Sequence, residues 1–301
     1  MHRVDLTPDG LVAGIKDLAT LPEVALRIAQ LAEDPGTSAA DIGREISKDP
    51  ALTSRVLRVA NSPAFGHLGK IATISRAITV LGIRQVRDLS VGITAVRTFE
   101  GIGNGLVTME SFWRQNVLCA VAAGHIAAHR GGRHAAESPF IAGLLHDIGQ
   151  LVIYHRAPEL GRRALLMWVD AIDDRDLSDC EREVMGFDHC AVGVALARQW
   201  HLPRSLQECI EFHHEPERAR EFPIDVAAVH VANSVAVLAE IASGNLADAP
   251  PISEAALLLL GMDRKELPRI LEETMKSAPE LLSLLGADDA PLAPPVVERI
   301  A

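Results

Sequence analysis

A histidine and an aspartate stand side by side in the run Gly143–Gly149, which reads Gly-Leu-Leu-His-Asp-Ile-Gly at the end of an apolar segment. Imidazole and carboxylate groups are ligands that divalent metals accept. Neighbouring residues on a helix point about 100° apart, so His146 and Asp147 reach one ion only if it lies between their faces. We interpret the pair as half of a metal site, whose remaining ligands come from elsewhere in the chain.

Three further groups of polar residues could complete this metal site. His189 opens a segment with the spacing of a core helix, and His213 and His214 are adjacent near the end of another expected helix. Asn233 is a polar residue inside an otherwise apolar helical segment. Helical bundles build metal sites from imidazoles and carboxylates on facing helices. We therefore predict that these groups lie close to the His-Asp pair.

Other patterns in the chain do not predict chemistry. His125 and His129 are four residues apart but lack the glutamate of a hydrolytic His-Glu-x-x-His motif, which predicts a structural or surface role. The glycine-rich segment 100–105 lacks the strand and the glycine spacing of a dinucleotide site, so we interpret it as a flexible linker. The acidic stretch 173–183 lacks the spacing of a calcium loop and is interpreted as the solvated start of a helix.

Apolar positions recur at helical spacing along nearly the whole chain, which predicts an all-α fold. Ser38 stands three residues before Asp41, which predicts a capping box at the start of a helix over 39–47. Asp49 precedes a proline, a typical helix start. About five short helices are expected in the first hundred residues, and a single helix over 137–155 is expected to carry the His-Asp pair.

Composition limits the class of protein. The net charge of −11 disfavours binding to nucleic acid or to an anionic membrane. We find no secretory signal and no apolar run near the roughly 20 residues that span a bilayer, so we expect a bacterial, cytoplasmic protein. The cysteines have no paired metal or redox spacing and are expected to be buried or half-buried free thiols, at Cys119, Cys180, Cys190 and Cys209.

Basic residues are concentrated between residues 51 and 98, where seven stand against one acid, Asp88. One interpretation is a surface for an anionic partner, either an acidic protein face, a nucleotide or a nucleic acid. The alternative is that the arginines lie over an apolar helix face with their charged ends in water. The residues assigned to this basic surface are Arg55, Arg58, Arg76, Arg84 and Arg87.

Taken in order, these motifs resemble the HDOD family, which comprises regulatory relatives of the HD and HD-GYP metal-dependent phosphohydrolases. The resemblance runs from about Leu11 to about Glu240 and implies an all-helical, two-lobed fold. The implied divisions are an N-terminal helical lobe with its linker (1–105), an HD-like lobe (106–286) and a proline-rich, flexible tail (287–301). The matching segments are Leu21–Val24, Asp49–Pro63, Ile74–Gly82, Phe112–Arg114, Gly143–Gly149, Gly186–His189, Trp200–Pro203 and His213–Pro216.

The resemblance also implies a set of metal ligands, for Fe, Mn or Zn. The matching positions are His146, Asp147, His189, His213 and His214. Gln115 stands where catalytic relatives have an early histidine, Asn233 where they have a late carboxylate, and Gln150 where they often have a lysine. The Gly-Tyr-Pro motif is replaced by Glu-Pro-Glu-Arg at 215–218. Neutral amide oxygens are weaker ligands, so this resemblance implies a degenerate metal site.

The leading hypothesis is a non-catalytic signal-transduction output or adaptor module that acts through contacts with a signalling protein. The alternative is a metal-dependent phosphohydrolase acting on a nucleotide or cyclic dinucleotide. A third hypothesis is a sensor that binds a nucleotide without turnover and depends on Arg84 or Arg87.

Overall fold

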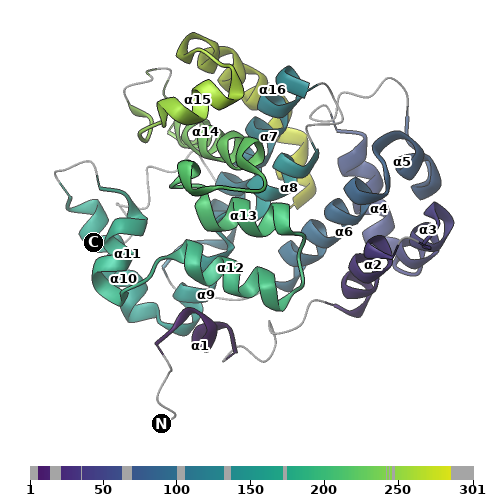
Figure 1. The fold of residues 1–301 in the computed structure, drawn as a ribbon, viewed down its shortest axis with the longest axis horizontal. Coiled ribbons are helices and arrows are strands. Elements are labelled where there is room, and N and C mark those ends of the chain that lie inside the picture. The colour runs from purple at the N-terminus through teal and green to yellow at the C-terminus, as the bar shows by residue number, and fades with distance from the viewer. Residues whose placement is uncertain are drawn as a thin grey trace.

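The computed structural model describes residues 6–13, 22–34, 36–62, 70–99, 106–131, 137–171, 175–241, 243, 245 and 248–285. Within these residues the chain is helical and contains no strand, which confirms the predicted fold class (Figure 1). The first lobe contains α2 (Glu23–Glu33), α3 (Ala39–Ser47), α4 (Pro50–Ala60), α5 (Ile74–Leu81) and α6 (Ile83–Thr98). The other elements are α1 (Pro8–Ala13), α7 (Met109–Gly131), α8 (Glu137–Leu145), α9 (Ile148–Arg156), α10 (Pro158–Val169), α11 (Leu177–Met185), α12 (His189–Gln199), α13 (Arg204–Phe212), η3 (Pro216–Arg218), α14 (Pro223–Glu240), α15 (Glu254–Leu260), η5 (Arg264–Glu266) and α16 (Leu267–Leu285).

The first lobe is built around α6, which contacts α2, α3, α4 and α5. Its helix starts follow the local signals in the sequence. Ser38 and Asp41 form the predicted capping box at the start of α3, and the carboxylate of Asp49 accepts hydrogen bonds from the backbone of Ala51 and Leu52. These caps satisfy amide groups that a helix cannot satisfy internally.

Helix α1 does not join the first lobe. It packs against α9 and α12, and Figure 1 places it beneath these helices, away from α2. Leu11 and Val12 provide its buried face. The first described helix is therefore part of the packing of the second lobe, although it lies within the segment 1–105. The expected linker at 100–105 and the tail at 287–301 lie outside the described residues.

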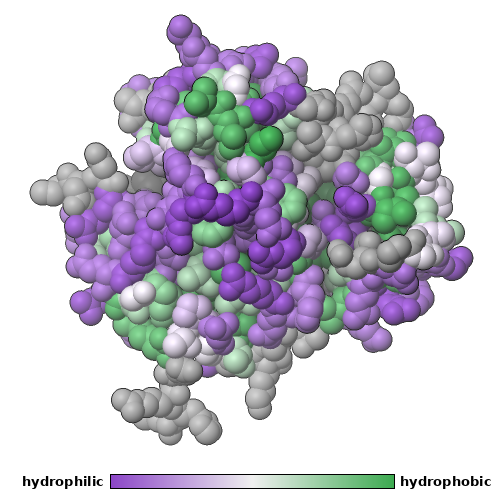
Figure 2. All heavy atoms as spheres, in the orientation of Figure 1, coloured by the Kyte–Doolittle hydropathy of each residue, from purple (hydrophilic) through white to green (hydrophobic). Residues whose placement is uncertain are grey.

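The second lobe is organised by α7 and α14, which pack along each other and against α8 and α16. α14 has the length and mean hydropathy of a candidate membrane span, yet 61% of that span is buried within the fold. The face shown in Figure 2 is mainly hydrophilic, with an apolar patch over α15. Because its apolar side chains contact other helices, α14 serves as the core helix of this lobe.

His125 and His129 connect α7 to α16. The Nε2 atom of His125 lies 3.2 Å from the hydroxyl of Ser277, and that of His129 lies 2.8 Å from the carboxylate of Glu273. Both histidines therefore contact a neighbouring helix, as the predicted structural role requires. α16 continues to residue 285 at the end of the described residues.

The prediction of one helix over 137–155 was wrong. The chain leaves helical geometry at His146 and Asp147, so α8 ends before the pair and α9 begins after it. Gly149 explains part of this arrangement, because a Cβ atom there would lie 2.0 Å from the backbone oxygen of His189. A glycine lets α9 approach the start of α12 this closely, and that approach brings His189 to the His-Asp pair.

Candidate metal centre

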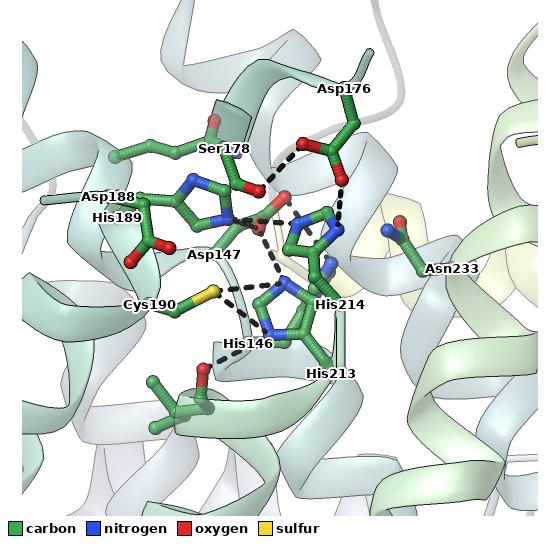
Figure 3. Close-up of polar contacts among 12 residues, drawn as sticks. His146, Asp147, Asp176, Ser178, Asp188, His189, Cys190, His213, His214 and Asn233 are labelled. Carbon is green, nitrogen blue, oxygen red and sulfur yellow. Dashed lines mark hydrogen bonds and ion pairs between the residues drawn. The ribbon is translucent and has the colours of Figure 1, made fainter. Parts of the chain in front are cut away.

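The five predicted ligands lie close together in the second lobe, in two overlapping groups of potential metal donors that share His213 (Figure 3). His146 and Asp147 come from the turn between α8 and α9, and His189 is the first residue of α12. His213 ends α13, and His214 follows it. Three helix ends therefore bring together residues that lie as many as 68 positions apart. We call these five side chains the His-Asp centre.

Each imidazole of the centre has its Nδ1 atom held by an oxygen. His146 donates to the backbone oxygen of Gly143 over 2.8 Å, and His213 to that of Ile210 over 3.1 Å. The other two acceptors are carboxylates, at 2.6 Å for His189 with Glu181 and 2.9 Å for His214 with Asp176. These acceptors fix the tautomer that leaves Nε2 unprotonated in a neutral ring. In the neutral form of each ring the Nε2 atom is therefore the one that can bind a metal.

The inward atoms have the spacing of ligands around a metal ion. Nε2 of His146 lies 3.3 Å from Oδ2 of Asp147, and Oδ1 of Asp147 lies 3.2 Å from Nε2 of His189 and 3.5 Å from Nε2 of His213. Nε2 of His214 lies 3.2 Å from Nε2 of His189. Bonds of about 2.0 Å to a tetrahedral ion place neighbouring ligand atoms about 3.3 Å apart. The observed separations fit such an ion.

Unsatisfied atoms point to the same conclusion. Nε2 of His146 and Oδ1 of Asp147 are buried and have no partner with hydrogen-bond geometry among the described residues, although charged neighbours lie close. Nε2 of His214 faces Nε2 of His189, and two nitrogen lone pairs repel each other unless a proton or a cation lies between them. Buried polar atoms without partners are costly. A divalent cation bound by His146, Asp147 and His213 would satisfy the first two atoms, and one bound by His189, His213 and His214 would separate the facing nitrogens.

The charge state of the centre also suits a cation. Burial lowers the pKa of His146 to about 4 and, with help from His213, that of His214 to about 4, so both rings are neutral at pH 7. Burial opposes ionisation of Asp147, but the neighbouring histidines, His146 first, hold its pKa well below the ordinary value. Burial likewise opposes protonation of His213, but Cys190 and Asp147 raise its pKa to about 10. Glu181 likewise raises the pKa of His189 against the effect of burial, so without a metal the centre holds protons on these two rings, which a bound cation would displace.

Two functional residues were missed because the acidic stretch 173–183 was interpreted as solvated. Asp176 does cap the start of α11, as expected, but it also holds His214. Glu181 is fully buried, and its Oε2 atom accepts from both the ring and the backbone amide of His189. The helical spacing could have revealed the burial of Glu181, because this residue lies on the same face of α11 as the buried residues Ser178 and Met185. An acid on an apolar helix face needs a partner.

The comparison with known families decides the identity. The HDOD domain matches residues 18–216, about two thirds of the chain. The chain belongs to the HDOD family. An uncharacterised protein of Treponema pallidum (strain Nichols) is 28% identical over 222 residues, which are 73% of this chain but only 42% of that protein. The chain thus spans less than half the length of this relative.

Solved structures share the HDOD fold. A Shewanella amazonensis protein, provisionally named a phosphohydrolase, superposes with a TM-score of 0.70 at 23% identity, covering 91% of this chain and 97% of that one. A Geobacter sulfurreducens HDOD domain protein of unknown function gives 0.64 at 24% identity, covering 97% and 98%. A Marinobacter aquaeolei protein, provisionally named for signal transduction, gives 0.66 at 22% identity, covering 90% and 59%. These identities establish the fold alone.

The two neutral positions of this HDOD chain contact each other. Nε2 of Gln115, on α7, donates to Oδ1 of Asn233, on α14, over 3.2 Å. Figure 3 places Asn233 to one side of the His-Asp centre. Gln150, which stands where catalytic relatives often have a lysine, accepts a long hydrogen bond of 3.5 Å from the hydroxyl of Tyr154. All three amides therefore have partners in the helical packing.

The residues assigned to the basic surface separate into two groups. Arg58, Arg76 and Arg84 are exposed and Arg55 is half-buried. Arg87 does not lie at the surface, because only 6% of it is exposed and its Nε lies 2.7 Å from a carboxylate oxygen of Asp88. The sequence misplaced Arg87 because its spacing does not show that α6 is surrounded by other helices. The basic surface is thus confined to the other four arginines.

Proposed function

We propose that this HDOD chain is a non-catalytic signal-transduction module that acts through protein contacts, with a divalent cation held in its His-Asp centre for structural stability. The observation that carries the proposal is the burial of four of the five ligands, all except His214, whose side chain is 20% exposed. His146 is fully buried, His189 and His213 are 1% exposed, and Asp147 is 8% exposed. A hydrolytic metal keeps one coordination position open to water and substrate. These side chains leave little room for a phosphoester to approach.

The amide pair supports the same proposal. A hydrolytic metal needs enough negative charge and firm ligands to hold and activate a water molecule. Gln115 and Asn233 carry no charge, and each satisfies the other across α7 and α14. Neither residue therefore supplies the negative charge that a second metal ion would need.

A protein partner would bind through the surface of the module. Arg58, Arg76 and Arg84 are exposed in the first lobe of a chain whose net charge is −11, so they suit an acidic face on a signalling protein. The Marinobacter neighbour carries a provisional signal-transduction name, which agrees with this role.

The test combines metal analysis with an activity panel. Purified protein would be loaded with Zn²⁺, Mn²⁺ or Fe²⁺ and offered nucleotides, cyclic dinucleotides and a chromogenic phosphodiester. We expect bound metal and no turnover above that of the matched Asp147→Ala variant. Metal-dependent hydrolysis that this variant abolishes would refute the non-catalytic proposal.

The alternative, a phosphohydrolase acting on a nucleotide or cyclic dinucleotide, has one specific observation in its favour. The five ligand positions retained from catalytic relatives fall in two overlapping groups of potential metal donors that share His213. A Shewanella amazonensis neighbour also carries a provisional phosphohydrolase name. The panel above separates the two proposals, because only the hydrolase predicts turnover that is sensitive to Asp147→Ala.

A further inference from the structure

A cysteine thiol lies beside the His-Asp centre. Cys190 follows His189 on the first turn of α12 and is 5% exposed. Its Sγ atom lies 3.8 Å from Nδ1 and 3.9 Å from Nε2 of His213, and Figure 3 shows it directed at that ring. A buried cysteine is often only a small apolar side chain. Here the sulfur instead faces a cluster of nitrogen donors.

We propose that Cys190 is itself a metal ligand, whose thiolate joins the imidazoles of His189, His213 and His214 around a cation in this part of the His-Asp centre. This inference rests on the metal-binding part of the proposed function. One donor atom from each of these four residues lies within 4.8 Å of the other three. On binding, the thiol loses its proton to solvent and the sulfur donates an electron pair to the ion.

The distances suit this donor set. Bonds of about 2.3 Å from sulfur and about 2.0 Å from nitrogen to a tetrahedral ion place the two ligand atoms about 3.5 Å apart. The separation of 3.9 Å between Sγ of Cys190 and Nε2 of His213 exceeds this by only a few tenths of an ångström. The separation of 3.2 Å between the Nε2 atoms of His189 and His214 matches the value of about 3.3 Å for two nitrogens. Small side-chain rotations would complete the geometry.

A thiolate would change which ion the centre prefers. Sulfur is a soft ligand that favours Zn²⁺ and its spectroscopic substitute Co²⁺, whereas carboxylate oxygens suit Mn²⁺ and Mg²⁺. Loss of the thiolate should therefore weaken Zn²⁺ binding roughly tenfold or more while changing Mn²⁺ binding little. A structural thiol that only fills space predicts the same small effect on both ions.

Cobalt spectroscopy of the full chain provides the test. We expect Co²⁺ to give visible ligand-field bands together with an intense near-ultraviolet sulfur-to-cobalt charge-transfer band. In Cys190→Ser the charge-transfer band should vanish while ligand-field bands persist. Cys209→Ser is the matched control, since Cys209 is also buried in this lobe but is absent from the donor set, and it should retain both.

The outcomes separate the two proposals. Ligand-field bands without charge transfer in the wild-type protein would overturn thiolate ligation and leave metal binding intact. No cobalt signal at all would overturn thiolate ligation together with the metal-binding part of the proposed function. Charge transfer that survives in Cys190→Ser would assign the sulfur to another cysteine.

A second measurement does not depend on the folding of a variant. X-ray absorption of the Zn²⁺-loaded wild-type protein should contain a sulfur shell at about 2.3 Å alongside nitrogen at about 2.0 Å. A shell made only of nitrogen and oxygen would exclude Cys190 as a ligand.

Discussion

Replacing Gly149 with alanine should disrupt both the stability of the second lobe and its metal centre. A Cβ atom at this position would lie 2.0 Å from the backbone oxygen of His189 and 2.6 Å from the backbone nitrogen of Gly193. Both contacts are with backbone atoms of α12, so no side-chain rotation relieves them. α9 and α12 would have to separate, and His189 would move with α12.

The size of the effect follows from these distances. The carbonyl oxygen must retreat by about 1.4 Å to restore a contact of 3.4 Å. Overpacking of this kind costs typically about 1–3 kcal/mol, and the backbone contact places Gly149→Ala at the upper end. Alanine regains at most about 1 kcal/mol from its helix propensity. We expect a net loss of roughly 2 kcal/mol in the free energy of unfolding.

The metal centre should respond more sharply than the fold. Metal–ligand distances must lie within roughly 0.2 Å of their preferred values, which is far less than the displacement required of the segment carrying His189. We therefore expect Gly149→Ala to weaken Zn²⁺ binding at least about tenfold, a loss typical when a ligand is misplaced. Chelator competition measures this affinity, and urea unfolding of the metal-free protein measures stability separately.

Gly43→Ala provides the matched control. Gly43 lies within α3, and the nearest atom to an added Cβ is 3.8 Å away, an ordinary contact. The same substitution should there stabilise the protein by about 0.5–1 kcal/mol and leave Zn²⁺ affinity unchanged. Equal effects of the two variants, or full stability and metal affinity in Gly149→Ala, would refute the close-approach argument.

Three further predictions concern the centre and its surroundings. Glu181→Gln should lower Zn²⁺ affinity about 10–100-fold in chelator competition, because it weakens the hydrogen bond that orients His189, whereas the exposed control Glu183→Gln should not. Burial raises the pKa of Asp225 to about 6, so its stabilising neutral form is complete below pH 3.8 and is lost as pH rises through 6. Asp225→Asn should therefore raise the free energy of unfolding at pH 7 by at most about 3 kcal/mol and leave it unchanged at pH 3.5. A higher free energy of unfolding at both pH values would show that the ionisation of Asp225 is not the cause. Removing the cation with a chelator should lower the Tm by roughly 5 °C if Zn²⁺ was present at about 100 times its Kd, and an unchanged Tm would argue against a structural cation.

Local signals in the sequence were enough to predict much of the fold. Ser38 with Asp41, and Asp49 before its proline, marked helix starts that the structure reproduces, because a cap is formed by residues two or three positions apart. The all-α class followed from apolar spacing, and the ordered motifs identified the HDOD family. The sequence also predicted which side chains of the His-Asp centre could bind a metal, because metal preference depends on side-chain chemistry.

Other features were decided by contacts between distant segments. The break in the helix at His146 and Asp147 accompanies the close approach of α9 to α12, which helical spacing alone does not reveal. The burial of Arg87 likewise depends on the helices around α6, and its sequence neighbours gave only its charge. Gln115 and Asn233 form their pair across 118 positions.

The sequence by itself determined which chemical groups this protein has for binding a cation, and most of the helices that carry them. Only the tertiary structure decided that Glu181 and Asp176 orient two of the imidazoles, that Cys190 faces His213, and that four of the five ligands are buried. The physical reason is that side-chain chemistry and helix capping are local properties. Orientation, desolvation and access instead arise when helices far apart in the chain pack against one another.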